Sequence, residues 1–516
     1  MYYIVKNIST DINVIPDFAK LINNKLKVFN IEEIEILKKA IDARKRNALK
    51  FVYTLKIKVS VNLPNHPDFI EYTDIVDETE IKKSLHDLHP FIIGMGPAGL
   101  FSALKLVENG FKPYLFDKGD DLSLRKEKVK LFWDEKKLDT DSNIQFGEGG
   151  AGAFSDGKLT ARNRNFYSEQ VFDYLIKFSA DRDIKIDALP HLGTDKLEEI
   201  NLNIRNYLIK AGCKFFYRHE LQKISIEGNI LKSVIINNIK YKPEIVILAT
   251  GNSSRQIFNE LFINNVPLEN KPFAVGFRIE HPAEYINHLF YGKNTDFNLV
   301  GAATYKLTAN YNNRGIYSFC MCPGGFVIPA SSELDGQVVN GMSYSCRNNV
   351  FSNSALVVTV DKKDFGKHPL AGIDFQLKLE KDNYFNFLSP AQNAYDFVNH
   401  TRSAGINNTS NFCGCIEKDL ADLVPGFISD SLKHGLSVFN KKLSFKDSSF
   451  LKKGILMSVE TRTSSPVRIL RDSIHYNSTG IKNLYPVGEG AGYAGGIISS
   501  ATDGLKISGI FNKNQS

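Results

Sequence analysis

A short apolar run followed by closely spaced glycines constrains this chain more than any other stretch of its sequence. Residues 91–100 read FIIGMGPAGL, with glycines at 94, 96 and 99, and a segment with helical spacing follows up to Gly110. This is the GxGxxG pattern between a predicted strand and a predicted helix. The first glycine permits a tight turn, the second lets the backbone approach a phosphate, and the third lets the helix pack on the strand.

An acidic residue follows where a nucleotide-binding unit requires one. The segment KPYLFDKG predicts a second strand that ends at Asp117. A carboxylate there can accept hydrogen bonds from ribose hydroxyls, while the helix N-terminus offers free N–H groups to a pyrophosphate. The stretch therefore predicts a βαβ unit that binds a dinucleotide. The sequence carries this fingerprint once, which favours FAD and leaves the electron donor open.

The overall composition excludes several classes of protein. A length of 516 residues predicts roughly two to four domains, because single cores stop growing at about 250 to 300 residues. The chain is 43% hydrophobic and 23% charged, as in ordinary globular proteins, and its net charge of +7 favours anionic partners only weakly. It lacks a long uncharged apolar run, a secretory signal pattern and a dense set of cysteines. We therefore expect no membrane span and a cytoplasmic location.

Changes in residue pattern divide the chain into four segments. Residues 1–88 predict a small α+β unit, and residues 89–255 alternate strands with helices. Residues 256–453 are irregular and rich in aromatics, glycine and asparagine, whereas 454–516 return to strand, glycine turn and helix. The predicted fold class is α/β. It comprises a three-layer FAD-binding Rossmann-type domain in two parts, an inserted β-rich substrate domain and a small N-terminal α+β domain.

The N-terminal unit contains a basic stretch with two interpretations. Asn30 and Glu33 form a capping pair, and the apolar spacing that follows predicts a helix up to Ile41, before a strand over 51–59. The stretch KKAIDARKRNALK, residues 38–50, is either a solvated helix face or a nucleic-acid patch. We favour the solvated face.

Long motifs resemble those of known flavoproteins. The segments FIIGMGPAGLFSALKLVENG, LFDKG, ILATG and YPVGEGAGYAGGI resemble the FAD-binding segments of the glutathione-reductase-like flavoprotein superfamily. The segments NIQFGEGGAGAFSDGKLTAR, FCMCPGGFVIPASSE, NGMSYSCRN and ETRTSSPVRILRD resemble the bacterial family of uncharacterised FAD-dependent dehydrogenases. The resemblance covers nearly the whole chain. It implies FAD and a dehydrogenase-like oxidoreductase that moves hydride to or from flavin N5, and it implies no substrate.

Candidate cofactor-binding residues follow from these motifs and from the resemblance. Gly488 and Glu489 match the second cofactor motif, after which the final helix would direct its positive end at the flavin. Residues 145–158 contain five glycines and are read as a flavin-side loop, with a mobile surface loop as the alternative. Lys118 and Arg125 are candidates for pyrophosphate neutralisation or, equally, for an exposed surface role. The full predicted set is Gly94, Gly96, Pro97, Ala98, Gly99, Asp117, Lys118, Arg125, Gln145, Gly147, Gly149, Gly150, Thr250, Gly251, Gly488, Glu489, Gly490, Gly495, Gly496 and Ile497.

Two CxC pairs supply the candidate catalytic residues. Cys320 and Cys322 form the first pair, and Cys413 and Cys415 the second. A disulfide across one residue would be strained and easily reduced, so a pair beside the flavin could cycle. The alternatives are buried structural thiols and a four-thiolate zinc site, whose usual spacing differs. We prefer Cys322 as the residue that lines the reaction site, and we predict no metal.

An arginine cluster and the partners of the protein complete the expectations. Arg462, Arg468 and Arg471 stand near Glu460 and either bind a carboxylate or FAD phosphate or form an internal ion-pair network. We expect a small-molecule substrate, with NAD(P)H or a protein as the electron-transfer partner. Two other functions stay open: a flavoprotein that acts on RNA through its basic N-terminal domain, and a non-catalytic flavin-binding sensor.

Overall fold

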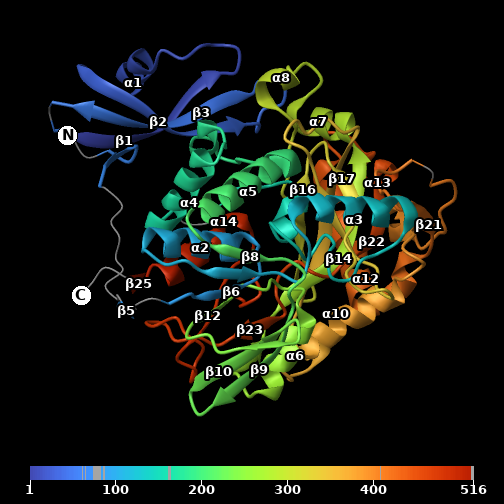
Figure 1. The fold of residues 1–516 in the computed structure, drawn as a ribbon. Helices are drawn as coiled ribbons and strands as arrows, with labels where there is room; N and C mark the ends of the chain where they lie inside the picture. The colour runs from blue at the N-terminus through green and yellow to red at the C-terminus, as the bar shows by residue number, and fades with distance from the viewer. Residues whose placement is uncertain are drawn as a thin grey trace.

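The protein is a mixed α/β molecule with several β-sheets (Figure 1). The computed structural model describes residues 1–60, 62–63, 66–73, 83–84, 88–160, 164–406 and 408–512. The end of the NIQFGEGGAGAFSDGKLTAR motif and much of 74–87 lie outside these residues. No helix in this described part of the chain is both long and apolar enough to cross a lipid bilayer.

A five-stranded parallel sheet forms around the first glycine motif. Its order is β24-β12-β6-β7-β8, and the strands are β6 (Phe91–Ile93), β7 (Tyr114–Phe116), β8 (Lys214–Phe216), β12 (Val246–Leu248) and β24 (Leu484–Pro486). Helix α2 (Pro97–Glu108) connects β6 to β7, which confirms the predicted strand–helix–strand unit. The parallel pairing of these strands places the turns that follow β6, β7, β12 and β24 at one edge of the sheet.

Both faces of this sheet are covered. Ile92, Leu115 and Ile247 pack against one helical layer. Its helices are α2, α4 (Phe166–Lys177), α5 (Gly193–Lys210) and α14 (Ile497–Ser508). Phe91 and Val246 point to the other face. There they meet the antiparallel strands β9 (Leu221–Glu227), β10 (Ile230–Ile236) and β11 (Ile239–Tyr241), together with α6 (Arg255–Ile263).

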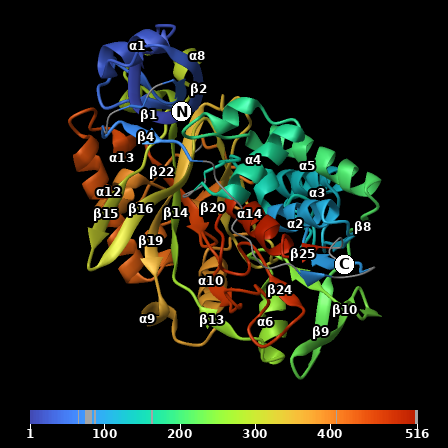
Figure 2. The same cartoon turned by 90° about the vertical axis from the view of Figure 1, so that its left-hand side faces the viewer.

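A seven-stranded sheet forms the second large layer, beside the first in both views (Figures 1 and 2). Its order is β15-β16-β19-β14-β22-β20-β21. The strands are β14 (Phe273–Pro282), β15 (Thr308–Tyr311), β16 (Arg314–Cys322), β19 (Phe351–Val360), β20 (Ser389–Asn393), β21 (Cys415–Glu417) and β22 (Ile455–Glu460). Strand β22 follows residue 453 in sequence and pairs with β14.

The expectation of an irregular, loop-rich stretch over 256–453 missed its helices. Besides most of α6, the described helices of this stretch are α7 (Ala283–Tyr291), α8 (Phe297–Val300), α9 (Lys362–Phe365), α10 (Ala371–Asp382), α11 (Ala394–Asn399), α12 (Gly426–Leu443) and α13 (Phe450–Lys453). In α12, Ile428, Leu432, Leu436 and Phe439 repeat at helical spacing and are buried. They cover one face of the seven-stranded sheet.

The predicted helix from Asn30 to Ile41 is wrong. These residues form β2 (Ile31–Asp42), which pairs antiparallel with β3 (Lys50–Val59), while β3 itself was predicted correctly. Asn30 has a φ of 57° and caps no helix. The β-branched isoleucines fit a pleated surface, and the pairing with β3 outweighs the weak helical spacing. The sheet order β2-β3-β1-β4 is completed by β1 (Tyr2–Asp11) and β4 (Phe69–Glu71), with α1 (Phe18–Leu26) against it.

Several cations of the stretch 38–50 contact the chain itself. The Lys39 Nζ lies 4.3 Å from the ring centre of Phe51, and Arg44 Nε donates to Asp42 at 2.9 Å. Arg46 Nη2 donates to the carbonyl of His288, on α7, at 3.0 Å. The basic stretch thus joins the N-terminal unit to the seven-stranded sheet layer.

Candidate functional site

A cavity of about 1560 Å³ opens between the two large sheets. Ordinary ligand pockets measure about 300–1000 Å³, so this one has room for a dinucleotide and a second molecule. Its wall includes Gly94 after β6, Phe319 on β16 and Ala274 on β14. The predicted cofactor residues on the wall are Gly94, Gly96, Pro97, Ala98, Asp117, Lys118, Gln145, Gly147, Gly150, Thr250, Gly251, Glu489, Gly495, Gly496 and Ile497. The predicted residues Gly99, Arg125, Gly149, Gly488 and Gly490 lie behind it.

The first glycine turn leaves a helix end free. Gly94 has a φ of +105°, and a Cβ there would lie 2.3 Å from the carbonyl oxygen of Ala249. A Cβ at Gly99 would lie 2.0 Å from the carbonyl oxygen of Gly94, so only glycine lets α2 pack on this turn. Gly96 is the N-cap of α2 and supplies no side chain to its first N–H groups. Those groups are therefore available to an anion.

Asp117 shapes the turn that it faces. Its Oδ2 accepts from the Met95 N–H at 2.8 Å and its Oδ1 from the Gly119 N–H at 2.9 Å. Each carboxylate oxygen keeps a further lone pair, and the residue lines the cavity. Asp117 can therefore accept a ribose hydroxyl as well as holding the glycine turn.

The two predicted phosphate partners occupy different places. Lys118 lines the cavity, where its Nζ lies 4.2 Å from the ring centre of Phe146 and 3.3 Å from Asp141. Arg125 is 0% exposed, which excludes a surface role. Its guanidinium donates to the carbonyls of Asn143 at 2.8 Å and Ile144 at 2.9 Å, and to two more in the same loop. Arg125 thus fixes the glycine-rich loop from behind.

The second glycine turn, after β24, touches the turn that follows β12. A Cβ at Gly490 would lie 2.3 Å from the carbonyl oxygen of Gly251, so the two turns touch. Gly496 is the N-cap of α14 and supplies no side chain to its N–H groups, and a Cβ at Gly495 would meet nothing within 4 Å. A second free helix end, that of α14, therefore faces the cavity. In the same turn, burial raises the pKa of Glu489 to about 7, although Asn252 Nδ2 donates to it at 2.8 Å.

One residue of the first CxC pair reaches the cavity wall. The pairing of β16 with β19 shifts register between Phe319 and Cys322, and Cys320 within this bulge has a φ of +45°. A bulge redirects a side chain, and a positive φ such as that of Cys320 is uncommon for a residue other than glycine. Cys320 lines the cavity, whereas Cys322 is 0% exposed behind it. The sequence had favoured Cys322 as the lining residue; the bulge reverses the two.

Charged residues surround this pair. Asp156 accepts from Arg347 Nη2 at 2.6 Å, and its Oδ2 lies 2.8 Å from Lys158 Nζ. Burial raises the pKa of Asp156, but Lys158 and Arg347 outweigh it and hold the pKa at about 2. Burial also raises the pKa of Glu460 to about 7, even though Glu460 pairs with Arg278. Lys158, Asp156 and Glu460 all line the cavity.

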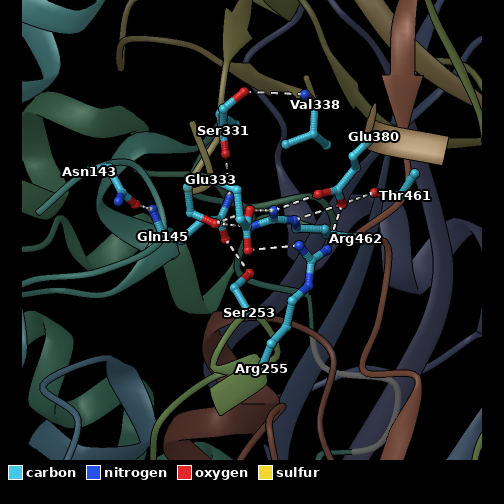
Figure 3. Close-up of polar contacts among 12 residues, drawn as sticks. Asn143, Gln145, Ser253, Arg255, Ser331, Glu333, Val338, Glu380, Thr461 and Arg462 are labelled. Atoms are coloured by element: carbon cyan, nitrogen blue, oxygen red, sulfur yellow. Dashed lines mark hydrogen bonds and ion pairs between the residues drawn. The ribbon is translucent and has the colours of Figure 1, made fainter. Parts of the chain in front are cut away.

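The arginine cluster forms internal ion pairs, as one of the two interpretations expected. Arg462 pairs with Glu380 at 2.8 Å and Glu333 at 2.6 Å, and Arg255 pairs with the same two carboxylates (Figure 3). Thr461 and Ser332 add hydrogen bonds to this network. The other two arginines are also paired, Arg468 with Glu269 at 2.8 Å and Arg471 with Asp503 at 2.7 Å. Their charges are thus balanced within the chain.

The second CxC pair lies far from the first. Cys415 is on β21, at one edge of the seven-stranded sheet, and β16 is next to the opposite edge. Cys413 packs against the carbonyls of Phe132 and Trp133. The four-thiolate zinc site is therefore excluded, and no other group of metal-ligating side chains occurs among the described residues.

Sequence reasoning missed the charged residues around Cys320. Lys158 and Asp156 stand in the DGK segment after the glycine-rich loop, and Arg278 stands inside an apolar strand, β14. A charge inside an otherwise apolar strand is the one local signal that could have singled out Arg278, because buried charges are rare unless paired.

Comparisons with known proteins agree with a flavoprotein. Residues 272–463 match the family model described as "FAD-dependent protein, C-terminal domain-like", which supports FAD as the cofactor. Among solved structures, CtdE in complex with FAD and a substrate is 9% identical, with a TM-score of 0.33 and coverage of 82% of this chain and 79% of that one. A geranylgeranyl bacteriochlorophyll reductase-like protein from Thermoplasma acidophilum is 12% identical, with a TM-score of 0.33 and coverage of 81% and 76%. These two likenesses are too remote to indicate function.

A much closer relative comes from Clostridium beijerinckii. It is an uncharacterized protein that is 39% identical over 518 residues, and the match covers 97% of this chain and 96% of the relative. Identity at that level over nearly the full length of both proteins indicates shared descent and a shared fold. Residues 272–463 match an FAD-dependent C-terminal domain-like segment, and the chain as a whole belongs to the same family as the uncharacterized clostridial protein.

Proposed function

We propose that this chain is an FAD-dependent oxidoreductase that exchanges hydride between flavin N5 and a small-molecule substrate. One observation carries the proposal: a single cavity connects two helix N-termini without side-chain caps, those of α2 and α14, with Asp117 beside the first. An extended ligand with a central pyrophosphate, a ribose and a ring that becomes negative on reduction matches this set of donors and acceptors.

Different residues would bind the pyrophosphate, the ribose and the ring of FAD. The N–H groups after Gly96 would bind the pyrophosphate, and Asp117 would accept from the ribose. Gly495 and Gly496 would admit the ring to the N-terminus of α14, whose dipole stabilises negative charge there. Bound FAD supplies a two-electron donor or acceptor at N5.

The remaining part of the cavity is suited to a substrate. Tyr317 and Phe319 form an aromatic wall, and Glu460 lines the same end. A carboxyl group with a pKa of about 7 can hold or release a proton near neutral pH, so we assign general acid–base chemistry to Glu460. Arg278 pairs with its carboxylate and fixes its position.

The test is the visible spectrum of the purified protein under anaerobic conditions, before and after NADH and then NADPH. We expect a yellow protein. Bleaching by one nucleotide would identify the donor, whereas a protein that stays yellow until a metabolite or a partner protein is added would have that reductant instead. A colourless protein that also refuses added FAD would contradict the proposal.

A further inference from the structure

The two thiols of the first CxC pair differ in position and in ionisation. The Cys322 side chain hydrogen-bonds that of Cys320, and its Sγ also lies 3.3 Å from the Cys320 carbonyl oxygen. The Cys322 hydrogen bond, aided by Lys158 and Arg278, holds the pKa of Cys320 well below its ordinary value despite burial. The same bond, together with burial, raises the pKa of Cys322. Of the two, Cys320 on the cavity wall is therefore the more easily ionised, and Cys322 behind it keeps its proton more readily.

The cations around the pair outnumber the carboxylates by one. Three cations, Lys158, Arg278 and Arg347, lie around the two carboxylates Asp156 and Glu460. Asp156 pairs with two of the cations and Glu460 with the third. This count leaves one positive charge even with both carboxylates ionised. A thiolate on Cys320 balances it, since a cation favours the ionised thiol.

Two glycines make room for the Cys322 side chain. A Cβ at Gly341 would lie 2.7 Å from Cys322 Sγ, and one at Gly325 would lie 3.0 Å from Cys322 Cβ. Arg278 Nη2 donates to the Cys320 carbonyl at 2.7 Å and lies 3.5 Å from Cys322 Sγ. The left-handed φ of Cys320 persists because this donor holds its carbonyl. These contacts fix the positions of both cysteines relative to the cavity.

We propose that Cys320 and Cys322 form a dithiol–disulfide couple that exchanges two electrons with the flavin. The inference rests on the proposed function, because it needs FAD in the cavity. In the reducing direction the S–S bond breaks and accepts two electrons and one proton, all from the reduced anionic flavin. Cys320 becomes the thiolate and Cys322 the thiol, and the flavin becomes oxidised. In the reverse direction the dithiol returns the same electrons and proton to oxidised FAD.

An electron count tests the couple without an enzymatic assay. Holoprotein is oxidised with diamide, freed of reagent and titrated anaerobically with dithionite. We expect about four electrons per FAD, because flavin and disulfide are each two-electron couples. Cys320→Ser and Cys322→Ser should each accept about two. Cys346→Ser, at an exposed cysteine outside the pair, is the matched control and should accept about four.

A mass measurement reads the bond directly in the wild-type chain, so that folding defects in the variants cannot decide the outcome. Maleimide labelling of diamide-treated protein, followed by proteolysis, should leave Cys320 and Cys322 unlabelled and joined. Labelling of both thiols, or uptake of only about two electrons by FAD-loaded wild type, would overturn the couple and leave the proposed function standing. A chain that binds no FAD would overturn both.

Discussion

At the scale of single residues, the cavity is open beside the turn before α14 because Gly495 and Gly496 carry no side chains. A Cβ at Gly495 would meet no atom within 4 Å, and its φ lies outside the left-handed region. The fold can therefore accept a side chain there, but that side chain would occupy space assigned to FAD. We expect Gly495→Val to weaken FAD binding at least about tenfold, or about 1.4 kcal/mol, in a fluorescence titration of the apoprotein.

The matched control for this prediction is Gly426→Val. Gly426 also has nothing within 4 Å of a built Cβ, but it begins α12 away from the cavity wall. We expect both apoproteins to show the same circular dichroism spectrum and melting temperatures within about 2 °C of wild type. Equal FAD affinity in the two variants would show that the ring does not lie at the N-terminus of α14.

The buried carboxyl group of Glu280 should make the free energy of unfolding depend on pH. Burial raises the pKa of Glu280 to about 7, although the Ser410 N–H donates to it at 3.0 Å. The folded state therefore holds this proton more tightly than the unfolded state, and the stabilisation is complete below about 4.5 and lost as the pH rises through about 7. We expect Glu280→Gln to gain about 3 kcal/mol relative to wild type between pH 4.5 and pH 8, measured by urea unfolding.

The control for the pH experiment is Glu227→Gln. Glu227 is exposed at the end of β9. Its substitution should leave the difference in unfolding free energy from wild type unchanged across the same pH range. A Glu280→Gln variant that behaves in the same way would mean that Glu280 is solvated in the folded protein.

At the scale of elements, the contact between α12 and β16 depends on a glycine. A Cβ at Gly435 would lie 2.5 Å from Cγ2 of Ile316, which is 1% exposed on β16. Alanine in a helix interior ordinarily stabilises by up to about 1 kcal/mol, but overpacking costs about 1–3 kcal/mol. We therefore expect Gly435→Ala to lower the free energy of unfolding, whereas Gly426→Ala in the same helix should lower it by less than about 0.5 kcal/mol. A Gly435→Ala variant more stable than wild type would mean that α12 does not rest on Ile316.

The elements that the sequence predicted are those with local causes. The β6–α2–β7 unit follows from glycines, an apolar run and Asp117, all within one short stretch. Strand β2 was missed because its partner β3, and not its own pattern, decides its structure. The exposure of Cys320 and the burial of Cys322 depend on a bulge against β19, a strand about thirty residues further along the chain. Such long-range pairings leave little local trace, so the β6–α2–β7 unit could be predicted and the surroundings of the thiols could not.

At the scale of the whole molecule, the cavity exists only while the two large sheets stay together. The buried network of Arg255, Arg462, Glu333 and Glu380 joins α6, which covers the five-stranded sheet, to α10 and the end of β22 (Figure 3). Trp133 on α3 (Leu122–Glu135) contacts a smaller sheet: its Nε1 donates to the Pro329 carbonyl on β17 (Phe326–Pro329) at 3.1 Å, and β17 pairs with β18 (Val339–Met342). Trp133 is the single tryptophan of the chain, so its fluorescence reports on this junction.

Removing one partner of the network should therefore separate the sheets more easily. In Arg462→Met, Glu380, whose side chain is 1% exposed, keeps Arg255 but loses its second cation. Breaking a buried pair in this way lowers the free energy of unfolding by about 3–5 kcal/mol. Arg468→Met is the matched control, because Arg468 and Glu269 are both more than a third exposed and such pairs contribute about 0–1 kcal/mol. Urea unfolding followed by Trp133 fluorescence should rank the two variants accordingly. Equal midpoints would mean that the network carries no part of the contact between the sheets. A double variant, Arg462→Met with Glu380→Met, should cost less than the sum of its single changes, because the Arg255 and Glu333 that remain form a pair of opposite charges.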